Sequence, residues 1–221
     1  MPRFHVQEDL LVDYASGALP VPISLLVASH LTFCRRCRDE VGDLEAIGGM
    51  MLEDLNPIAM AADALEQALD GLSDDNLEAD KIAGSTRTAR SVDGSDLPAP
   101  LIEAIGGEVG AISWTRRAKG VEEATLVTGN GGYSASLMRI QPGASIPDHT
   151  HTGEELTLVL SGGFSDAGGH YGAGDVCHAD PEISHAPIAD PGEVCLCLVV
   201  ADGPVKLTGL VGRMLNPFLK L

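Results

Sequence analysis

The feature that most constrains the fold is a change in sequence pattern near residue 110. From there onward, short alternating apolar stretches such as YSASLMRI, ELTLVLSG and EVCLCLVVAD are separated by turns rich in glycine. Alternation with a period of two is typical of strands that bury one face, and closely spaced turns favour antiparallel pairing. The sequence therefore predicts an all-β sandwich or barrel in the second half of the chain.

The first seventy residues have the period of helices instead. Residues 5–16, the stretch ISLLVASHLTF that ends near Cys34, and residues 39–55 each place apolar side chains at helical spacing, and a weaker helix is expected over 61–70. Residues 71–100 are polar, rich in glycine, serine and aspartate, and without periodicity. That composition is typical of a linker between two folded parts.

The charge of the chain argues against binding to nucleic acid or to an anionic membrane. It has 14 Lys and Arg against 32 Asp and Glu, a net charge of -18, whereas phosphate binding needs cationic groups. A basic protein is the partner that this charge favours. The five cysteines are not spread as a disulfide framework, and neither a signal peptide nor an apolar run of about 18 residues is visible. We therefore expect a cytoplasmic protein.

The stretch HLTFCRRC holds the first candidate metal site. On a helix, His30, Cys34 and Cys37 fall at i, i+4 and i+7 on one face, and zinc takes four nitrogen or sulfur ligands in a tetrahedron. His5 is the fourth candidate, because the first 140 residues contain no other histidine or cysteine. Two alternatives stay open: a redox dithiol, which usually sits in a βαβ context absent here, and two buried structural cysteines beside an exposed histidine.

The stretch GASIPDHTHTGEELTLVLSG holds the second candidate site. His149 and His151 are two residues apart, so on a strand both point to one face, and Glu155 opens the next apolar run while Glu154 faces the other way. The spacing of the histidines, the glutamate and the flanking glycines resembles the first cupin motif.

The stretch GDVCHADPEISH resembles the second cupin motif. It offers His185 after the proline turn, with His178 as the alternative, although the usual glycine between proline and histidine is missing and the spacing is one residue short. The resemblance implies a divalent metal, with zinc as the first candidate; imidazole and carboxylate also suit iron, manganese, nickel or copper. The implied ligands are His149, His151, Glu155 and His185.

The two motifs together resemble a known family. The helical segment that carries His5, His30, Cys34 and Cys37 resembles the zinc-containing anti-sigma domain of bacteria, and its position before a cupin resembles the layout of the ChrR family. The resemblance implies an α + β multidomain protein. We expect a small all-α zinc-binding domain over 1–75, a polar linker over 76–100 and an all-β cupin domain of the jelly-roll type over 101–221.

The resemblance also implies a function. ChrR-like proteins are anti-sigma factors, so we expect a 1:1 complex with an extracytoplasmic-function sigma factor, released on an oxidative signal such as singlet oxygen or an organic hydroperoxide. The cupin would be needed for the response, and the protein would be a regulator rather than an enzyme. One alternative is a cupin metalloenzyme of the dioxygenase or isomerase type with an accessory zinc domain. Another is a module in which the cupin captures a small ligand and the helices report it.

Several other side chains are interpreted first as structural. Cys195 and Cys197 share one face of a strand and are predicted to be core residues, with a thiol pair that senses oxidant as the alternative. Cys177 is expected to pack beside the cupin metal pocket, and His170 to be exposed. The arginines at 35, 36 and 38 predict a solvated face. Three methionines are interpreted as core residues, with a partner groove as the alternative: Met50, Met51 and Met60.

Overall fold

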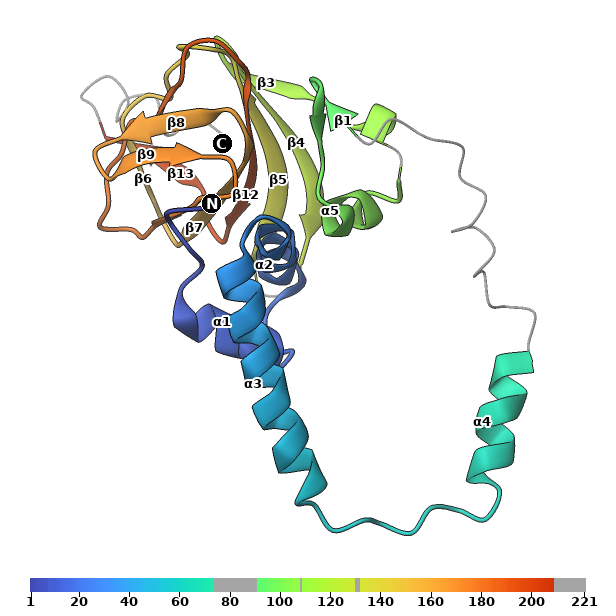
Figure 1. Cartoon of the computed structure of the whole chain (residues 1–221). Helices are drawn as coiled ribbons and strands as arrows, with labels where there is room; N and C mark the ends of the chain where they lie inside the picture. The colour runs from blue at the N-terminus through green and yellow to red at the C-terminus, as the bar shows by residue number, and fades with distance from the viewer. Residues whose placement is uncertain (74–90, 108, 130–131, 209–221) are drawn as a thin grey trace.

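The structure is a computed structural model that describes residues 1–73, 91–107, 109–129 and 132–208. Helices occupy its first part (Figure 1). In chain order they are α1 (Glu8–Ala15), α2 (Val21–Phe33), α3 (Arg35–Glu53), α4 (Ala64–Ser73) and α5 (Ala99–Ala104), followed by a 3-10 turn at Val109–Ala111. Among the helices of these ranges, none combines the length and the apolar character that a bilayer span requires.

Strands make up the rest of the described chain. A short hairpin, β1 (Ser91–Val92) and β2 (Ser95–Asp96), precedes α5. The later strands are β3 (Thr115–Ala118), β4 (Val121–Thr128), β5 (Ser134–Ile140), β6 (His149–His151), β7 (Glu155–Ser161), β8 (Gly163–Asp166), β9 (Gly169–Gly172), β10 (Val176–Ala179), β11 (Ile188–Ala189), β12 (Cys195–Ala201) and β13 (Val205–Leu207).

The strands pair antiparallel in three groups that form a barrel. A six-stranded sheet has the order β10-β7-β12-β5-β4-β3, a three-stranded sheet has the order β11-β8-β9, and β13 pairs with β6. Phe164 and Tyr171 of the smaller sheet share one buried cluster with Val159 and Cys195 of the larger sheet, so the two sheets face each other across this core. The all-β prediction for this half of the chain is confirmed.

The central strands of the large sheet, β7 and β12, are buried on both faces. Along β12, Leu196, Leu198 and Val200 belong to a cluster shared with the helices, whereas Cys195 and Cys197 belong to the cluster inside the barrel. A strand covered on both sides cannot alternate between apolar and polar residues. This explains the unbroken apolar run CLCLVVA, every residue of which is buried except the last.

Helix α2 covers the outer face of the large sheet. It packs on β12, β7 and β5 as well as on α1, α3 and α5, and Leu26 and Val27 are completely buried. A helix with apolar residues all round is one that other elements surround. The helical part is therefore docked directly on the barrel.

Helices α3 and α4 lie apart from the barrel (Figure 1). Cys37 and Val41 are buried in the first half of α3, but α3 then runs away from the sheet and its second half is exposed. Met50, Met51 and Met60 are exposed as well. Their interpretation as core residues is therefore wrong for the free chain.

The predicted helix ends agree with the structure at some positions and differ at others. The second helix ends at Phe33, as predicted, and Gly17, with φ +72°, follows the end of α1. The third helix begins four residues earlier than expected, at Arg35, and continues through both of its central glycines. Most of the predicted linker lies outside the described residues, while residues 91–96 form a hairpin. The domain limits stay a prediction.

The burial of α2 leads to a prediction about stability. Replacing Leu26 with alanine leaves a cavity between helix and sheet, and we expect a loss of about 2 to 5 kcal/mol in the free energy of unfolding. Urea denaturation followed by circular dichroism measures this loss. Val21→Ala is the matched control, because Val21 lies on the same helix but is exposed. Equal effects of the two changes would contradict the docking of α2.

Two candidate metal centres

The first centre brings together the four residues that the sequence selected. One nitrogen or sulfur atom from each of His5, His30, Cys34 and Cys37 lies within 4.8 Å of all the others. Nδ1 of His5 is 3.3 Å from Sγ of Cys34 and 3.6 Å from Sγ of Cys37, and Nε2 of His30 is 3.3 Å from Sγ of Cys37. We refer to this group as the helical centre.

A break between two helices shapes the helical centre. Cys34 has extended backbone angles, φ -110° and ψ 103°, so α2 ends before it and α3 begins after it. The expectation that the three residues share one face of a single helix is therefore wrong. His30 comes from the last turn of α2 and Cys37 from the first turn of α3, and the break directs them toward one point.

The side chains of the helical centre have the chemistry of a zinc site. Burial, together with the neighbouring Cys34, raises the pKa of Cys37 to about 12, and burial lowers the pKa of His30. Without a cation these groups are a thiol and a neutral imidazole. A bound zinc ion would stabilise the thiolate and use the lone pair of the neutral imidazole, as a two-histidine, two-cysteine site requires. The residues present fit that ion.

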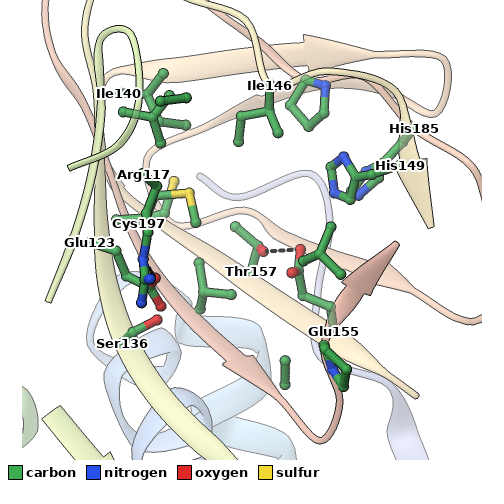
Figure 2. A pocket seen from close by; sticks show the side chains of 18 of the residues that line it. Arg117, Glu123, Ser136, Ile140, Ile146, His149, Glu155, Thr157, His185 and Cys197 are labelled. Carbon is green, nitrogen blue, oxygen red and sulfur yellow. Dashed lines mark hydrogen bonds and ion pairs between the residues drawn. The ribbon is translucent and has the colours of Figure 1, made fainter. Parts of the chain in front are cut away.

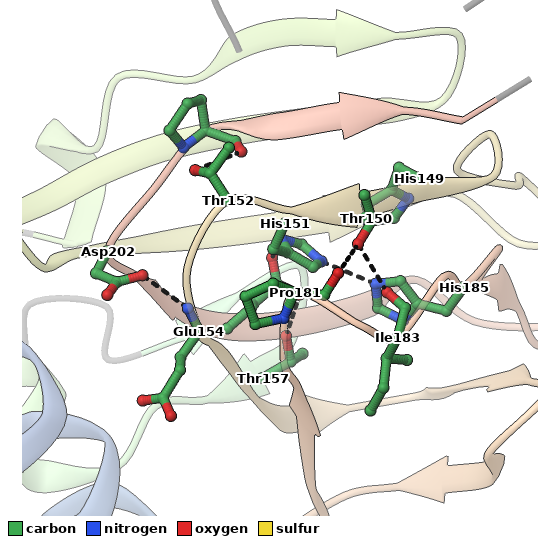
Figure 3. Close-up of polar contacts among 12 residues, drawn as sticks. His149, Thr150, His151, Thr152, Glu154, Thr157, Pro181, Ile183, His185 and Asp202 are labelled. Atoms are coloured by element: carbon green, nitrogen blue, oxygen red, sulfur yellow. Dashed lines mark hydrogen bonds and ion pairs between the residues drawn. The ribbon is translucent and has the colours of Figure 1, made fainter.

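The second centre lies inside the barrel. His149, His151 and His185 each place a ring nitrogen within 4.8 Å of the others, and we refer to them as the cupin centre. Nε2 of His151 lies 3.1 Å from Nε2 of His185 (Figure 3). His149 and His185 also exchange two backbone hydrogen bonds, of 3.1 Å and 3.0 Å, which hold the His185 segment against β6.

Outer hydrogen bonds orient two of these rings. Nδ1 of His149 donates to the carbonyl oxygen of Pro147 at 2.9 Å, and Nδ1 of His185 donates to Oδ2 of Asp166 at 3.2 Å. Each bond leaves Nε2 directed toward the centre, an arrangement typical of metal-binding histidines. Sequence reasoning missed Asp166, because it lies at the end of β8, beside a glycine-rich turn, with no motif around it.

The electrostatics of the cupin centre also fit a cation. Burial, and then the nearby His149 and His185, lower the pKa of His151 to about 4, so its imidazole is neutral at pH 7. Nδ1 of His151 is buried without a hydrogen-bond partner among the described residues. Three buried imidazoles that converge on one space offer ring nitrogens to a divalent metal.

Glu155 stands beside the three histidines rather than among them. Its Oε2 lies 3.5 Å from Nδ1 of His151, and its Oε1 accepts a hydrogen bond from Thr157 at 3.1 Å. Burial raises the pKa of this carboxyl to about 7. Glu155 is therefore close to the centre, on the side of His151 that faces away from His185. Its role as fourth ligand stays a prediction.

His178 lies outside the cupin centre. It is on β10, where its Nδ1 pairs with Nε2 of Gln7 at 2.8 Å and its Nε2 lies 3.9 Å from Oε1 of the exposed Glu154. The geometry favours His185 over His178, and Glu154 faces away from the site as expected. His170 is exposed, as predicted, and pairs with Asp190 at 2.7 Å.

A cavity of about 600 Å³ opens beside the cupin centre. His149, Glu155 and His185 line one side of it, and the ion pair between Arg117 and Glu123, with atoms 2.6 Å apart, lies on the opposite side (Figure 2). Between them are apolar walls that include Met138, Ile140, Ile146 and Phe164. This volume is within the range of small-molecule sites.

The barrel cysteines are buried free thiols. Sγ of Cys195 lies 3.6 Å from Sγ of Cys197, so the two share a face as predicted, and Cys197 reaches the cavity wall. The hydrogen bond with Cys195 and burial raise the pKa of Cys197. Cys177 groups with Asp166 and His185, which confirms that it packs beside the cupin centre.

Comparisons with known proteins agree with a helical part followed by a cupin barrel. Residues 103–206 match the family model described as the ChrR cupin-like domain. The chain is 37% identical over 219 residues, 99% of both chains, to the anti-sigma-E factor ChrR of Cereibacter sphaeroides. It aligns with a chain of the crystal structure of Rhodobacter sphaeroides SigE in complex with the anti-sigma ChrR, with a TM-score of 0.75 and 36% identity over 91% of this chain and 100% of that chain.

The fold and the two centres define a protein with a small helical part, which carries a two-histidine, two-cysteine cluster, docked on a cupin barrel with three converging histidines. The likeness to ChrR extends over 99% of both chains, so a particular family can be assigned. The chain belongs to the ChrR family of anti-sigma factors.

The two centres lead to a prediction about metal content. We expect two metal equivalents per chain, one of which is lost in the Cys34→Ser, Cys37→Ser variant and the other in the His149→Ala, His151→Ala variant, because each change removes two donors from one centre. Mass spectrometry of native protein and elemental analysis measure the stoichiometry. Cys195→Ser is the control, because Cys195 lies outside both groups. Loss of metal in the control, or retention of two equivalents in either double variant, would contradict the assignment.

Proposed function

We propose that this protein is an anti-sigma factor that binds an extracytoplasmic-function sigma factor through its helical part. The observation that carries the proposal is the likeness to ChrR across 99% of both chains, because it includes the helices as well as the cupin. The alignment with a chain from the complex of SigE with ChrR supports the same class of partner. The net charge of -18 suits a partner with a basic surface.

An exposed apolar surface supports a partner at the end of α3. Large apolar side chains cluster there and in the segment that follows, although water-exposed positions of this kind are usually polar. We refer to them as the distal patch: Ile47, Met50, Met51, Leu52, Leu55, Ile58 and Met60. Methionine side chains adapt their shape to a partner, which suits a binding surface.

The distal patch leads to a prediction about binding. Ile47→Glu places a charge in the patch, and we expect it to weaken sigma factor capture at least tenfold, because burying an unpaired charge in an apolar contact is costly. Capture by the full chain from the source cell's extract, with mass spectrometry to identify the sigma factor, measures this. Ile188→Glu is the matched control, because Ile188 is 51% exposed and Ile47 is 50% exposed, but Ile188 lies on the barrel.

Capture experiments need the full chain. Removing the barrel would leave the sheet-facing side of α2 bare, since α2 packs on β5, β7 and β12. The Cys34→Ser, Cys37→Ser variant of the full chain is expected to lose capture, because the helical centre fixes the junction of α2 and α3. If the wild type, folded and loaded with metal, captures no sigma factor, the anti-sigma proposal fails.

We also propose that the cupin receives an oxidative signal, singlet oxygen or an organic hydroperoxide, and that the protein acts in the cytoplasm. The expected outcome is that His149→Ala, His151→Ala retains capture of the sigma factor but no longer releases it when the oxidant is added, because the change removes the cupin centre and leaves all four residues of the helical centre in place. Reporter transcription from a sigma-dependent promoter, with and without oxidant, measures both properties. Wild-type induction in the variant would contradict this role of the cupin.

The cavity beside the cupin centre also fits a second function. A volume of about 600 Å³ beside three converging histidines is also what a cupin metalloenzyme, of the dioxygenase or isomerase type, would need. Turnover of a small molecule by the purified protein would favour the enzyme. Saturable binding without turnover would favour a sensor.

A further inference from the structure

The segment before α1 is fastened to one turn of the barrel, Gly172–Val176, which we call the docking turn. The backbone N–H groups of Arg3 and Phe4 donate to Oδ1 of Asp175 at 2.5 Å and 3.0 Å, and the N–H of Val176 donates to the carbonyl oxygen of Phe4 at 3.2 Å. Oδ2 of the buried Asp175 accepts the N–H of Gly172 at 2.9 Å. The residue next to His5 is therefore held by the barrel.

The same turn orients a second member of the helical centre. Nδ1 of His30 donates to the carbonyl oxygen of Gly174 at 2.9 Å, while its Nε2 faces Sγ of Cys37 at 3.3 Å. A hydrogen bond on the outer nitrogen fixes the protonation and the ring orientation of a metal-binding histidine. In this hydrogen bond the donor, His30, is on α2, but the acceptor, Gly174, belongs to the barrel.

The docking turn requires glycine at its centre. Gly174 has φ +90°, and a Cβ there would lie 2.8 Å from Cβ of Phe33 and 2.9 Å from Cγ of Pro2. The backbone of the turn therefore lies against the end of α2 and the N-terminal segment with no space for a side chain. This close contact brings the carbonyl of Gly174 within reach of His30.

From these contacts we infer that the barrel completes the helical centre. Asp175 and Gly174 act as positioning residues: they hold the segment that carries His5 and the ring of His30 in the geometry that binds metal. Undocking of this turn would loosen two of the four side chains at once. Metal retention by the helical centre therefore depends on the barrel.

A continuous set of contacts connects the docking region to the cupin centre. The ring of Phe4 packs on the ring of Tyr171 with centroids 4.5 Å apart. Tyr171 and Cys177 belong to the same buried cluster inside the barrel, and Cys177 groups with Asp166 and His185. A change at His185 can thus reach Phe4, the neighbour of His5. The inference deepens the proposed function and rests on it for its biological meaning, because it supplies a route by which the cupin acts on the helices.

The test measures metal loss from the full chain loaded with Co(II). Absorption from thiolate-to-cobalt charge transfer is lost when a chelator removes the ion, and alkylation of Cys34 and Cys37, read peptide by peptide, identifies the centre that opened. We expect Phe4→Ala and Asp175→Ala to speed the loss about tenfold or more, a size comparable with the roughly 10- to 100-fold loss of metal affinity that follows when outer partners of metal ligands are removed. Asp93→Asn is the control, because it removes a carboxylate of the β1–β2 hairpin that pairs with Arg139, away from the docking turn.

Phe4→Ala keeps the test decisive if Asp175→Ala disturbs the barrel, because Phe4 lies outside the barrel strands. Wild-type rates of cobalt loss and alkylation in folded Phe4→Ala would overturn the inference. Coupling between the centres is measured with His185→Ala, alone and combined with Phe4→Ala. We expect His185→Ala to speed cobalt loss at the helical centre in the wild type but not in Phe4→Ala, and equal effects in both backgrounds would overturn the coupling. Sigma factor capture is scored separately, so failure of the proposed function cannot be mistaken for failure of this inference.

Discussion

The burial of α2 between the other helices and the outer face of the large sheet is the interaction on which the rest of the structure depends. Leu26 and Val27 are completely buried there, and the facing strands contribute Leu158, Leu196 and Leu198 to the same cluster. A sheet face this apolar is stable in water only when something covers it. The helical part is therefore the second layer of the barrel, and its orientation is set by the sheet.

This arrangement places the helical centre at a junction. His30 lies in the last turn of a helix that is fixed to the barrel, whereas Cys37 lies in the first turn of α3, which extends away from it (Figure 1). Burial and the neighbouring Cys34 raise the pKa of Cys37, and burial lowers the pKa of His30, so without a cation a thiol and a neutral imidazole meet where α2 and α3 join. A metal ion would replace that contact with four coordinate bonds. These bonds would fix the angle between α2 and α3 for as long as the ion is bound.

Sequence reasoning selected the residues of both centres, but the local geometry that it assumed holds only for the histidines of the cupin centre. The period of two that directs His149 and His151 to one face is a property of any strand, and β6 has it. The choice between His185 and His178 needed the structure, because it depends on backbone bonds between His149 and His185 across the barrel. The exposure of Met51 was not predictable, since apolar spacing on a helix is the same for a core and for a partner surface. The extended backbone at Cys34 had no signal in the sequence.

The geometry of α3 explains how a small change at the helical centre can affect a distant surface. Cys37 lies in its first turn and the distal patch begins in its second half, so one helix of 19 residues, about 28 Å long, connects the metal to the surface proposed to bind the partner. A rigid helix converts a change of angle at one end into a displacement of several ångströms at the other.

A tenfold change in partner affinity corresponds to about 1.4 kcal/mol. The loss of one outer hydrogen bond to a metal ligand, which changes metal affinity by about 10- to 100-fold, is of that size. Loss of the hydrogen bond from His30 to the docking turn would therefore be large enough to change partner binding about tenfold.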